Sequence, residues 1–288
     1  MRQLHLIAHG EPSDVIELNT VSEPALGQED VLISMEAAPM NPSDFLFVRG
    51  IYGVRAAFPS SVGAEGVGQV AKIGSKVDPA LRGKRVLILP TYEQGTWADE
   101  VVVPVRNLVP MSDEADPLQL SMIGINPVTA YLLLNRYVSL MPGDWIGQTA
   151  ANAAMGQYII ALAKLAGVKT LNVVRREEAA EQVRQWGGDR VVLQGGNLHK
   201  DIEQALDGKK LSLVSIRWVD LPWASWPNRL NLAARLSSTA FKVGSSQLCR
   251  PESSSTVVLA STDSGSSIGY ATRRAKRSKR FTRNWETS

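Results

Sequence analysis

The chain has 288 residues, a formal net charge of +3 and a single cysteine, Cys249. A chain of this length could hold two domains, and its hydropathy predicts neither a membrane span nor a cleaved signal. One cysteine excludes a disulfide framework and a cysteine-rich zinc site. An alternating strand pattern over residues 3–8 leaves no room for a targeting peptide, so we expect a cytoplasmic protein.

The small net charge conceals two different compositions. Residues 1–214 carry 19 Lys and Arg against 24 Asp and Glu, whereas residues 215–288 carry 12 against 4. The sign of the charge balance therefore changes near residue 214. We expect the last 74 residues to form a separate, basic segment.

Residues 1–115 have the pattern of a β-rich domain. Strands are predicted at 31–35, 66–74, 85–89 and 97–103. Dense turn signals lie between them, including Asn41-Pro42, Arg82-Gly83 and Gln94-Gly95. Irregular β structure of this kind favours a barrel-like domain.

Residues 116–214 alternate between helix and strand. A helical stretch at 117–137, broken at Asn126-Pro127, leads to a strand at 144–149, a helix at 157–166 and a strand at 169–174. A helix to Trp186, a strand at 190–193, a helix at 198–206 and the start of a strand at 211–214 follow. This order predicts an α/β fold with a doubly wound parallel sheet.

Small residues follow the strand at 144–149. Ala150, Ala153 and Gly156 have the three-residue spacing of a dinucleotide-binding loop, where backbone approaches pyrophosphate at a helix N-terminus. Tight packing between strand and helix also explains small residues here, so the loop alone is a weak signal.

A pair of arginines ends the second strand of this unit. Arg175-Arg176 stands about twenty residues past the loop, where an acid would bind a ribose 2′-hydroxyl. A guanidinium there matches a 2′-phosphate in charge and geometry, which favours NADPH as the cofactor. The alternative is a solvated, charged helix start.

Several motifs together resemble one protein family. They are Asn41-Pro42-Ser43-Asp44, Gly50-Ile51-Tyr52-Gly53, Gly63-Ala64-Glu65-Gly66-Val67-Gly68, Gly95-Thr96-Trp97, Asn126-Pro127-Val128-Thr129-Ala130-Tyr131 and Asn172-Val173-Val174-Arg175. In this order they resemble the zinc-free medium-chain dehydrogenase/reductases, and among these the mitochondrial-type 2-enoyl thioester reductases. The resemblance covers roughly residues 1–214. It implies a GroES-like N-terminal domain followed by a Rossmann domain.

The resemblance implies NADPH-dependent reduction of a 2-enoyl thioester of coenzyme A or acyl carrier protein. Tyr52 stands at the position of the family's catalytic tyrosine. Hydride addition at Cβ puts negative charge on the thioester oxygen, and a phenol could stabilise that enolate and help to protonate Cα. The alternative is an aromatic side chain that shields a turn.

Cofactor contacts are also implied residue by residue. Asn126 would lie near the nicotinamide ribose, unless it only caps the helix at Pro127. Asn152, Ala153, Ala154, Met155 and Gly156 would line the pyrophosphate, and Arg175, Arg176 and Glu177 would flank the 2′-phosphate. Glu177 would repel that phosphate unless its carboxylate points outward. Glu65 is expected to be a structural hydrogen-bonding partner.

No metal site is expected. Relatives with catalytic zinc use thiolate and imidazole ligands, yet Ala64 stands where a ligand histidine would follow Gly63. The three histidines lie on unrelated segments.

The resemblance ends after Val214. The expected glycine pair and two further strands are missing, and residues 215–288 contain 15 serines and nine arginines without a sustained period. We interpret this segment as an out-of-frame, poorly ordered tail that leaves the Rossmann sheet incomplete and the enzyme weakly stable and impaired. The family's homodimer is therefore in doubt. A basic cluster at 273–280 leaves a nucleic-acid-binding arm as a less favoured alternative.

Two further functions stay open. A quinone oxidoreductase would share the fold, the cofactor and the lack of zinc. A nucleotide-binding remnant would bind the cofactor without turnover.

Overall fold

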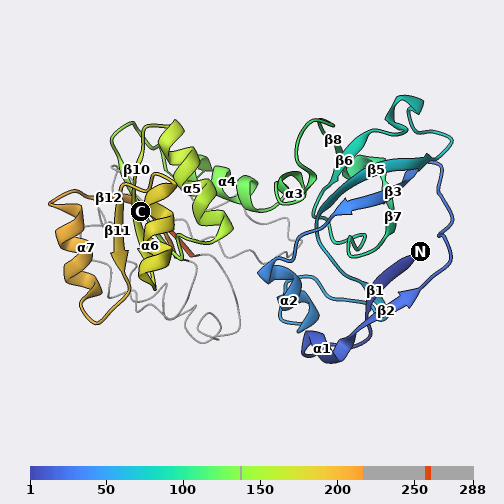
Figure 1. The fold of residues 1–288 in the computed structure, drawn as a ribbon, viewed down its shortest axis with the longest axis horizontal. Coiled ribbons are helices and arrows are strands. Elements are labelled where there is room, and N and C mark those ends of the chain that lie inside the picture. Colours follow the sequence, from blue (N-terminus) through green and yellow to red (C-terminus); the bar gives the residue numbers. More distant parts are fainter. Residues whose placement is uncertain (137, 217–256, 261–288) are drawn as a thin grey trace, which may run out of the picture.

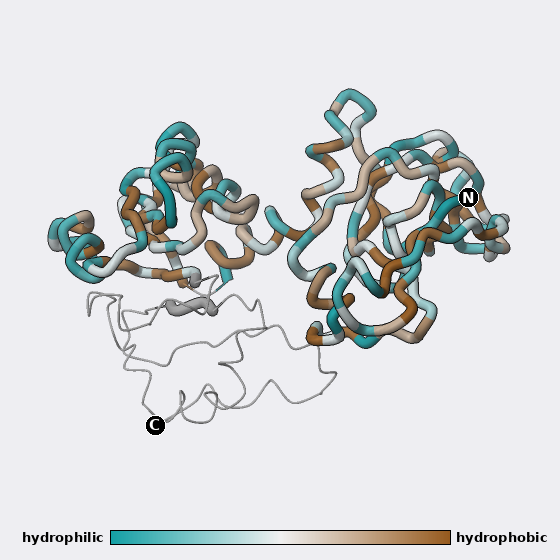
Figure 2. The backbone as a smooth tube through the Cα atoms, turned by 60° about the horizontal axis from the view of Figure 1, so that its bottom comes forward, coloured by the Kyte–Doolittle hydropathy of each residue, from teal (hydrophilic) through white to brown (hydrophobic). Residues whose placement is uncertain are grey.

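A computed structural model describes residues 1–136 and 138–216, together with the backbone of residues 257–260. The described residues form two lobes that lie side by side (Figure 1). Apolar stretches run through the strands inside each lobe, while many outer loops are hydrophilic (Figure 2). Among the described residues, no helix has both the length and the apolar character needed to cross a membrane.

The first lobe is built on two antiparallel sheets. One has the order β7-β3-β5-β6-β8, formed by β3 (Asp30–Ala37), β5 (Gly66–Ile73), β6 (Arg85–Ile88), β7 (Glu100–Pro104) and β8 (Leu108–Pro110). The other has the order β2-β1-β4, formed by β1 (Arg2–Leu6), β2 (Ile16–Thr20) and β4 (Ser60–Ser61). Alternating side chains of the larger sheet, such as Ile33, Val70 and Val86, build its core.

Short helical segments connect these strands. They are α1 (Pro12–Val15), α2 (Pro42–Val48), η1 (Pro79–Leu81) and η2 (Val105–Asn107). The prediction of a turn at Asn41-Pro42 was wrong, because these residues begin α2. The Asp44 carboxylate accepts a hydrogen bond from the Asn41 backbone N–H at 2.7 Å, and Pro42 suits the first helical turn.

The second lobe contains the expected parallel sheet. Its order is β11-β10-β9-β12-β13, with parallel strands β9 (Trp145–Thr149), β10 (Lys169–Val174), β11 (Arg190–Leu193) and β12 (Leu211–Ile216). The helices of this lobe are α4 (Asn126–Arg136), α5 (Ala154–Leu165), α6 (Glu177–Gln185) and α7 (Leu198–Leu206), and the short α3 (Pro117–Leu120) before them lies against β3 and β5 of the first lobe.

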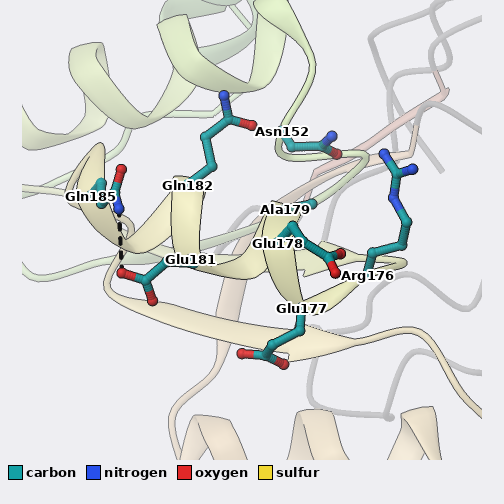
Figure 3. Close-up of a pocket in the computed structure, with 8 residues that line it drawn as sticks. All are labelled: Asn152, Arg176, Glu177, Glu178, Ala179, Glu181, Gln182 and Gln185. Atoms are coloured by element: carbon teal, nitrogen blue, oxygen red, sulfur yellow. Dashed lines mark hydrogen bonds between the residues drawn. The ribbon is translucent and has the colours of Figure 1, made fainter.

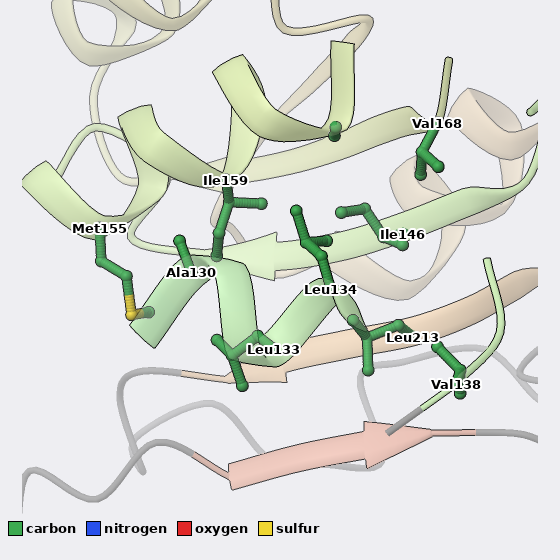
Figure 4. Packing of buried hydrophobic residues seen from close by; sticks show 10 residues of the cluster. Ala130, Leu133, Leu134, Val138, Ile146, Met155, Ile159, Val168 and Leu213 are labelled. Atoms are coloured by element: carbon green, nitrogen blue, oxygen red, sulfur yellow. The ribbon is translucent and has the colours of Figure 1, made fainter. Parts of the chain in front are cut away.

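Helices cover both faces of this sheet. On one face, α4 and α5 pack against Ile146 of β9 and Leu213 of β12 (Figure 4). On the other, Leu198, Ile202 and Leu206 of α7 pack against strand residues. The two apolar clusters explain why the β-strands here read as nearly continuous hydrophobic runs.

Two helix boundaries differ from the expectations. The helix expected from residue 157 begins at Ala154, because residues 154–156 form its first turn instead of a loop. The break expected at Asn126-Pro127 lies at residues 121–125, and α4 begins at Asn126. Pro127 is tolerated there because the first helical turn needs no backbone donor.

The strand expected to begin at residues 211–214 extends to Ile216 and has a further neighbour. β13 (Val257–Ala260) pairs antiparallel with β12, with Val214 opposite Leu259 and Ser215 opposite Val258. A short strand from the predicted tail thus lies beside β12. The structure describes only residues 215, 216 and 257–260 of the predicted tail. The basic cluster at 273–280 lies outside the described residues.

Candidate active site

The carboxyl ends of β9 and β12 mark the candidate site. The strands β10 and β11 lie on one side of β9, and β12 lies on the other. The direction of winding therefore reverses between β9 and β12, which is where open α/β sheets bind ligands. The turn at residues 150–153 leaves β9 at this point and leads into α5.

The turn depends on small residues, as the spacing predicted. The Ala153 N–H donates to the Ala150 carbonyl at 2.9 Å, and Ala150 adopts a left-handed φ of 50°. A Cβ on Gly156 would lie under 3.0 Å from backbone atoms of Ala151. Glycine at 156 is therefore required for α5 to pack against the turn.

The N-terminus of α5 is suited to an anion. Ala153 caps the helix without a side-chain hydrogen bond, and the first turn contains no acidic residue. The backbone N–H groups of this turn and the helix dipole are thus left for a negatively charged ligand. The Met155 side chain is buried in the apolar cluster against α4, so only the Met155 backbone could contact an anion here.

A pocket of about 710 Å³ lies beside this turn, along α6. Asn152 and Arg176 line it and extend toward the same side, whereas Glu177 points away from both (Figure 3). The Glu177 carboxylate accepts a hydrogen bond from Arg184 at 2.8 Å. Glu177 is therefore turned outward, as a 2′-phosphate at this position would require, and exposed Arg175 precedes Arg176.

Asn126 belongs to a buried polar network between the lobes. Its Nδ2 donates to Asn41 Oδ1 at 3.2 Å, and Asn41 Nδ2 donates to Glu65 Oε1 at 3.0 Å. All three side chains are buried, and so is Asp44 beside Asn41. The network links α2 and the start of β5 in the first lobe to α4 in the second.

Both acids of this network are held toward the neutral form. Burial raises the pKa of Glu65 to about 7, and the Asn41 amide and the backbone N–H groups of Ile125 and Gly124 offset part of this shift. Burial also raises the pKa of Asp44 to about 6, against hydrogen bonds from the backbone of Asn41 and Ala64. The expectation that Glu65 is a hydrogen-bonding partner is confirmed.

Tyr52 follows α2 in the first lobe and is half-buried. Its ring lies 5.4 Å from that of Tyr92, centroid to centroid, and Tyr92 also packs against Phe47 at 5.7 Å. Tyr52 thus belongs to an aromatic cluster of the first lobe, while residues 152–156 and 175–177 belong to the second.

Comparisons with known proteins agree with this architecture. Residues 27–113 match the alcohol dehydrogenase GroES-like domain. A mitochondrial enoyl-[acyl-carrier-protein] reductase of Dictyostelium discoideum is 37% identical over 198 residues, which are 66% of this chain and 56% of that relative. A crystal structure of a putative NADPH:quinone reductase from Bacillus thuringiensis is 27% identical, with a TM-score of 0.67 over 73% of this chain and 63% of that one.

Through both lobes the chain is similar to the medium-chain dehydrogenase/reductases. An Etr1p structure determined with NADP and crotonyl-CoA shares the fold, at 23% identity and a TM-score of 0.64 over 74% of this chain and 67% of that one. The chain spans about half the length of the curated relatives it matches. The parallel strands of the second lobe have the order 3-2-1-4, which is part of the Rossmann strand order.

The part of the chain that the structure describes contains no candidate metal site. No three His, Cys, Asp or Glu side chains there are placed so that they could hold a metal ion. The expectation of a zinc-free site stays a prediction, since Cys249 lies outside the described residues.

The sequence reasoning missed two features of the site. The Asn41–Asn126 contact joins residues 85 positions apart, and no local pattern reports it. Tyr92 gave no signal either, because it stands in a loop among turn residues. The capping-box spacing of Asn41 and Asp44 could have indicated the start of α2.

Proposed function

We propose that this chain is an NADPH-dependent reductase of 2-enoyl thioesters, with the acyl group carried on coenzyme A or acyl carrier protein. The uncapped N-terminus of α5, beside Arg176 and Asn152, carries the proposal, since it suits a pyrophosphate and a 2′-phosphate together. The choice of substrate is supported by the relative that is 37% identical and is named an enoyl reductase. It is also supported by Tyr52 at the matching position.

The cofactor would be held by the second lobe. Asn152, Ala153, Ala154 and the backbone of Met155 and Gly156 would bind the pyrophosphate. Arg175 and Arg176 would bind the 2′-phosphate, with Glu177 turned toward Arg184. Asn126, buried at the junction of the lobes, would contact the nicotinamide ribose. Bound NADPH supplies the hydride that the β-carbon of the substrate receives.

Tyr52 would act on the other half of the reaction. As the β-carbon gains hydride, the C=C pair shifts toward the thioester carbonyl and its oxygen becomes negative. The Tyr52 hydroxyl would donate a hydrogen bond to that oxygen and support proton transfer to Cα. One hydride and one proton are thus added, which yields the saturated thioester.

The test is turnover of crotonyl-CoA with NADPH by the full chain and by Tyr52→Phe. We expect Tyr52→Phe to lower kcat by about 100-fold or more while the cofactor still binds, because only the proton donor is removed. Equal turnover by both proteins would refute the role of Tyr52. If the full chain binds NADPH but reduces no enoyl thioester, the result favours the alternative of a nucleotide-binding remnant without catalysis.

A quinone oxidoreductase is the second candidate, favoured by the 27% identity to the putative NADPH:quinone reductase. Quinone reduction does not need the Tyr52 phenol. Tyr52→Phe should therefore leave NADPH-dependent reduction of a benzoquinone unchanged while it reduces enoyl turnover. If quinone turnover exceeds enoyl turnover in the full chain and neither depends on Tyr52, the second candidate holds.

The cytoplasmic location stays a prediction. The tail puts the family-type homodimer in doubt, and the mass of the full chain in light scattering decides between monomer and dimer.

A further inference from the structure

Tyr92 is the side chain that packs against the candidate catalytic phenol. The rings of Tyr92 and Tyr52 lie 5.4 Å apart at an interplanar angle of 44°, and Phe47 lies on Tyr92 at 5.7 Å. All three belong to one apolar cluster of the first lobe. The two phenols thus share an environment that excludes much of the solvent.

The backbone at Tyr92 is strained and firmly held. Its φ of 60° lies in the left-handed region, which non-glycine residues rarely occupy. Asn107, only 5% exposed, donates from Nδ2 to Glu93 Oε2 at 2.9 Å and to Thr91 Oγ1 and Gln94 Oε1 at 3.3 Å. Gln94 also donates to the Leu89 carbonyl at 3.2 Å. Both sides of Tyr92 are therefore fixed, and the strained conformation is maintained by its surroundings.

The Tyr92 hydroxyl is buried and makes no hydrogen bond of ordinary geometry with the described residues. A buried hydroxyl without a partner is costly, so a partner is expected when the site is assembled. The candidate partners of the Tyr92 hydroxyl are the hydroxyls of Tyr52 and Ser43. The Asp44 carboxylate is the charged group that acts on it. Burial, and after it Tyr52, raise the pKa of Tyr92, while Ser43 lowers it and the Asp44 carboxylate adds the smallest increase. Because the proposed function assigns the Tyr52 hydrogen to the thioester oxygen, the lone pairs of the Tyr52 oxygen are left to accept a hydrogen bond from the Tyr92 hydroxyl.

We propose that Tyr92 is a positioning residue for Tyr52, whose oxygen accepts a hydrogen bond from the Tyr92 hydroxyl. This inference rests on the proposed function. A phenol that accepts such a bond becomes a stronger donor through its own O–H, because linked hydrogen bonds polarise one another. Tyr92 would thus orient the Tyr52 hydroxyl and strengthen its bond to the thioester oxygen, without contacting the substrate itself.

A double-mutant cycle tests the inference. Tyr92→Phe keeps the ring and its packing but removes the hydroxyl. In the full chain we expect Tyr92→Phe to lower kcat for crotonyl-CoA by about three- to tenfold, the range of one neutral hydrogen bond, with KM unchanged. The basic limb of the pH–kcat profile should move to higher pH. In a Tyr52→Phe background, Tyr92→Phe should have no further effect. Tyr131→Phe, on a side chain of α4 that is 57% exposed, is the matched control.

A second readout does not require turnover. The ultraviolet difference spectrum of tyrosinate reports phenol ionisation, and the component lost in Tyr52→Phe belongs to Tyr52. We expect that component to appear at higher pH in Tyr92→Phe than in the unaltered chain. Unchanged ionisation and kcat in Tyr92→Phe, or equal losses in both backgrounds, would overturn the inference. If crotonyl-CoA is not reduced at all, the proposed function fails, and the spectrum still decides whether Tyr92 acts on Tyr52.

Discussion

Asn126 at the start of α4 donates a hydrogen bond to Asn41 before α2, 85 residues away, and so joins the two lobes through their buried polar side chains. Asn41 Nδ2 in turn donates a hydrogen bond to Glu65 Oε1 at 3.0 Å. These two hydrogen bonds help to hold the second lobe against the lobe that contains Tyr52.

We predict that Asn41→Ala destabilises the protein by about 2–3 kcal/mol, because it removes the donor to buried Glu65 and the acceptor for Asn126. Urea denaturation followed by circular dichroism measures the change. Asn135→Ala, on an exposed side chain of α4, serves as control and should stay within about 0.5 kcal/mol of the unaltered chain. Equal stabilities of the two variants would contradict the role of the network.

The pH dependence of stability should reflect Glu65. Its pKa is raised to about 7 in the folded protein from an ordinary value of 4.5, so the folded state binds more protons than the unfolded state between these values. Stability therefore falls as pH rises from about 4.5 to about 7. Glu65→Gln should remove the Glu65 part of this fall, leave the part that Asp44 contributes below about pH 6, and be more stable than the unaltered chain at pH 8 by up to roughly 3 kcal/mol. Both proteins should have similar stability near pH 4; parallel pH curves would contradict the prediction.

Gly156→Ala should disrupt the turn. A methyl group there would meet the backbone of Ala151, which cannot yield without moving the turn or α5. We expect a loss of about 1–3 kcal/mol and no thermal stabilisation by NADPH. Gly195→Ala is the matched control, since a Cβ there meets nothing within 4 Å. Retained stabilisation by NADPH in Gly156→Ala would show that the turn does not hold the cofactor.

Sequence pattern predicted much of the second lobe and less of the first. The strand at 190–193 and the helix at 198–206 were predicted residue for residue, because hydrophobic period and breakers agree there. The short strands β2 and β4 and the helix α2 were missed, since two to seven residues carry little periodicity. Asn41-Pro42 has the composition of a turn and of a helix start alike.

The candidate site was predictable where it depends on local spacing. The loop at 150–156 and the arginines after β10 are read from neighbouring residues. The Asn41–Glu65–Asn126 network and the Tyr52–Tyr92 pair depend on contacts between distant segments, which only the folded chain brings together.

Arg176 should select between the two dinucleotides. We predict that Arg176→Ala weakens NADPH binding by about 10- to 100-fold and leaves NADH binding unchanged, because the guanidinium pairs only with the 2′-phosphate. Arg82→Ala, on an exposed arginine of the first lobe, is the control. Equal losses for both dinucleotides in Arg176→Ala would place the side chain elsewhere in the site.

Isothermal titration calorimetry of the full chain with NADPH and with NADH is the most direct measurement. We predict that NADPH binds at least about tenfold more tightly than NADH, since only NADPH carries the phosphate that Arg176 would pair with. Equal affinity for the two dinucleotides, or binding of neither, would contradict a phosphorylated dinucleotide at the N-terminus of α5.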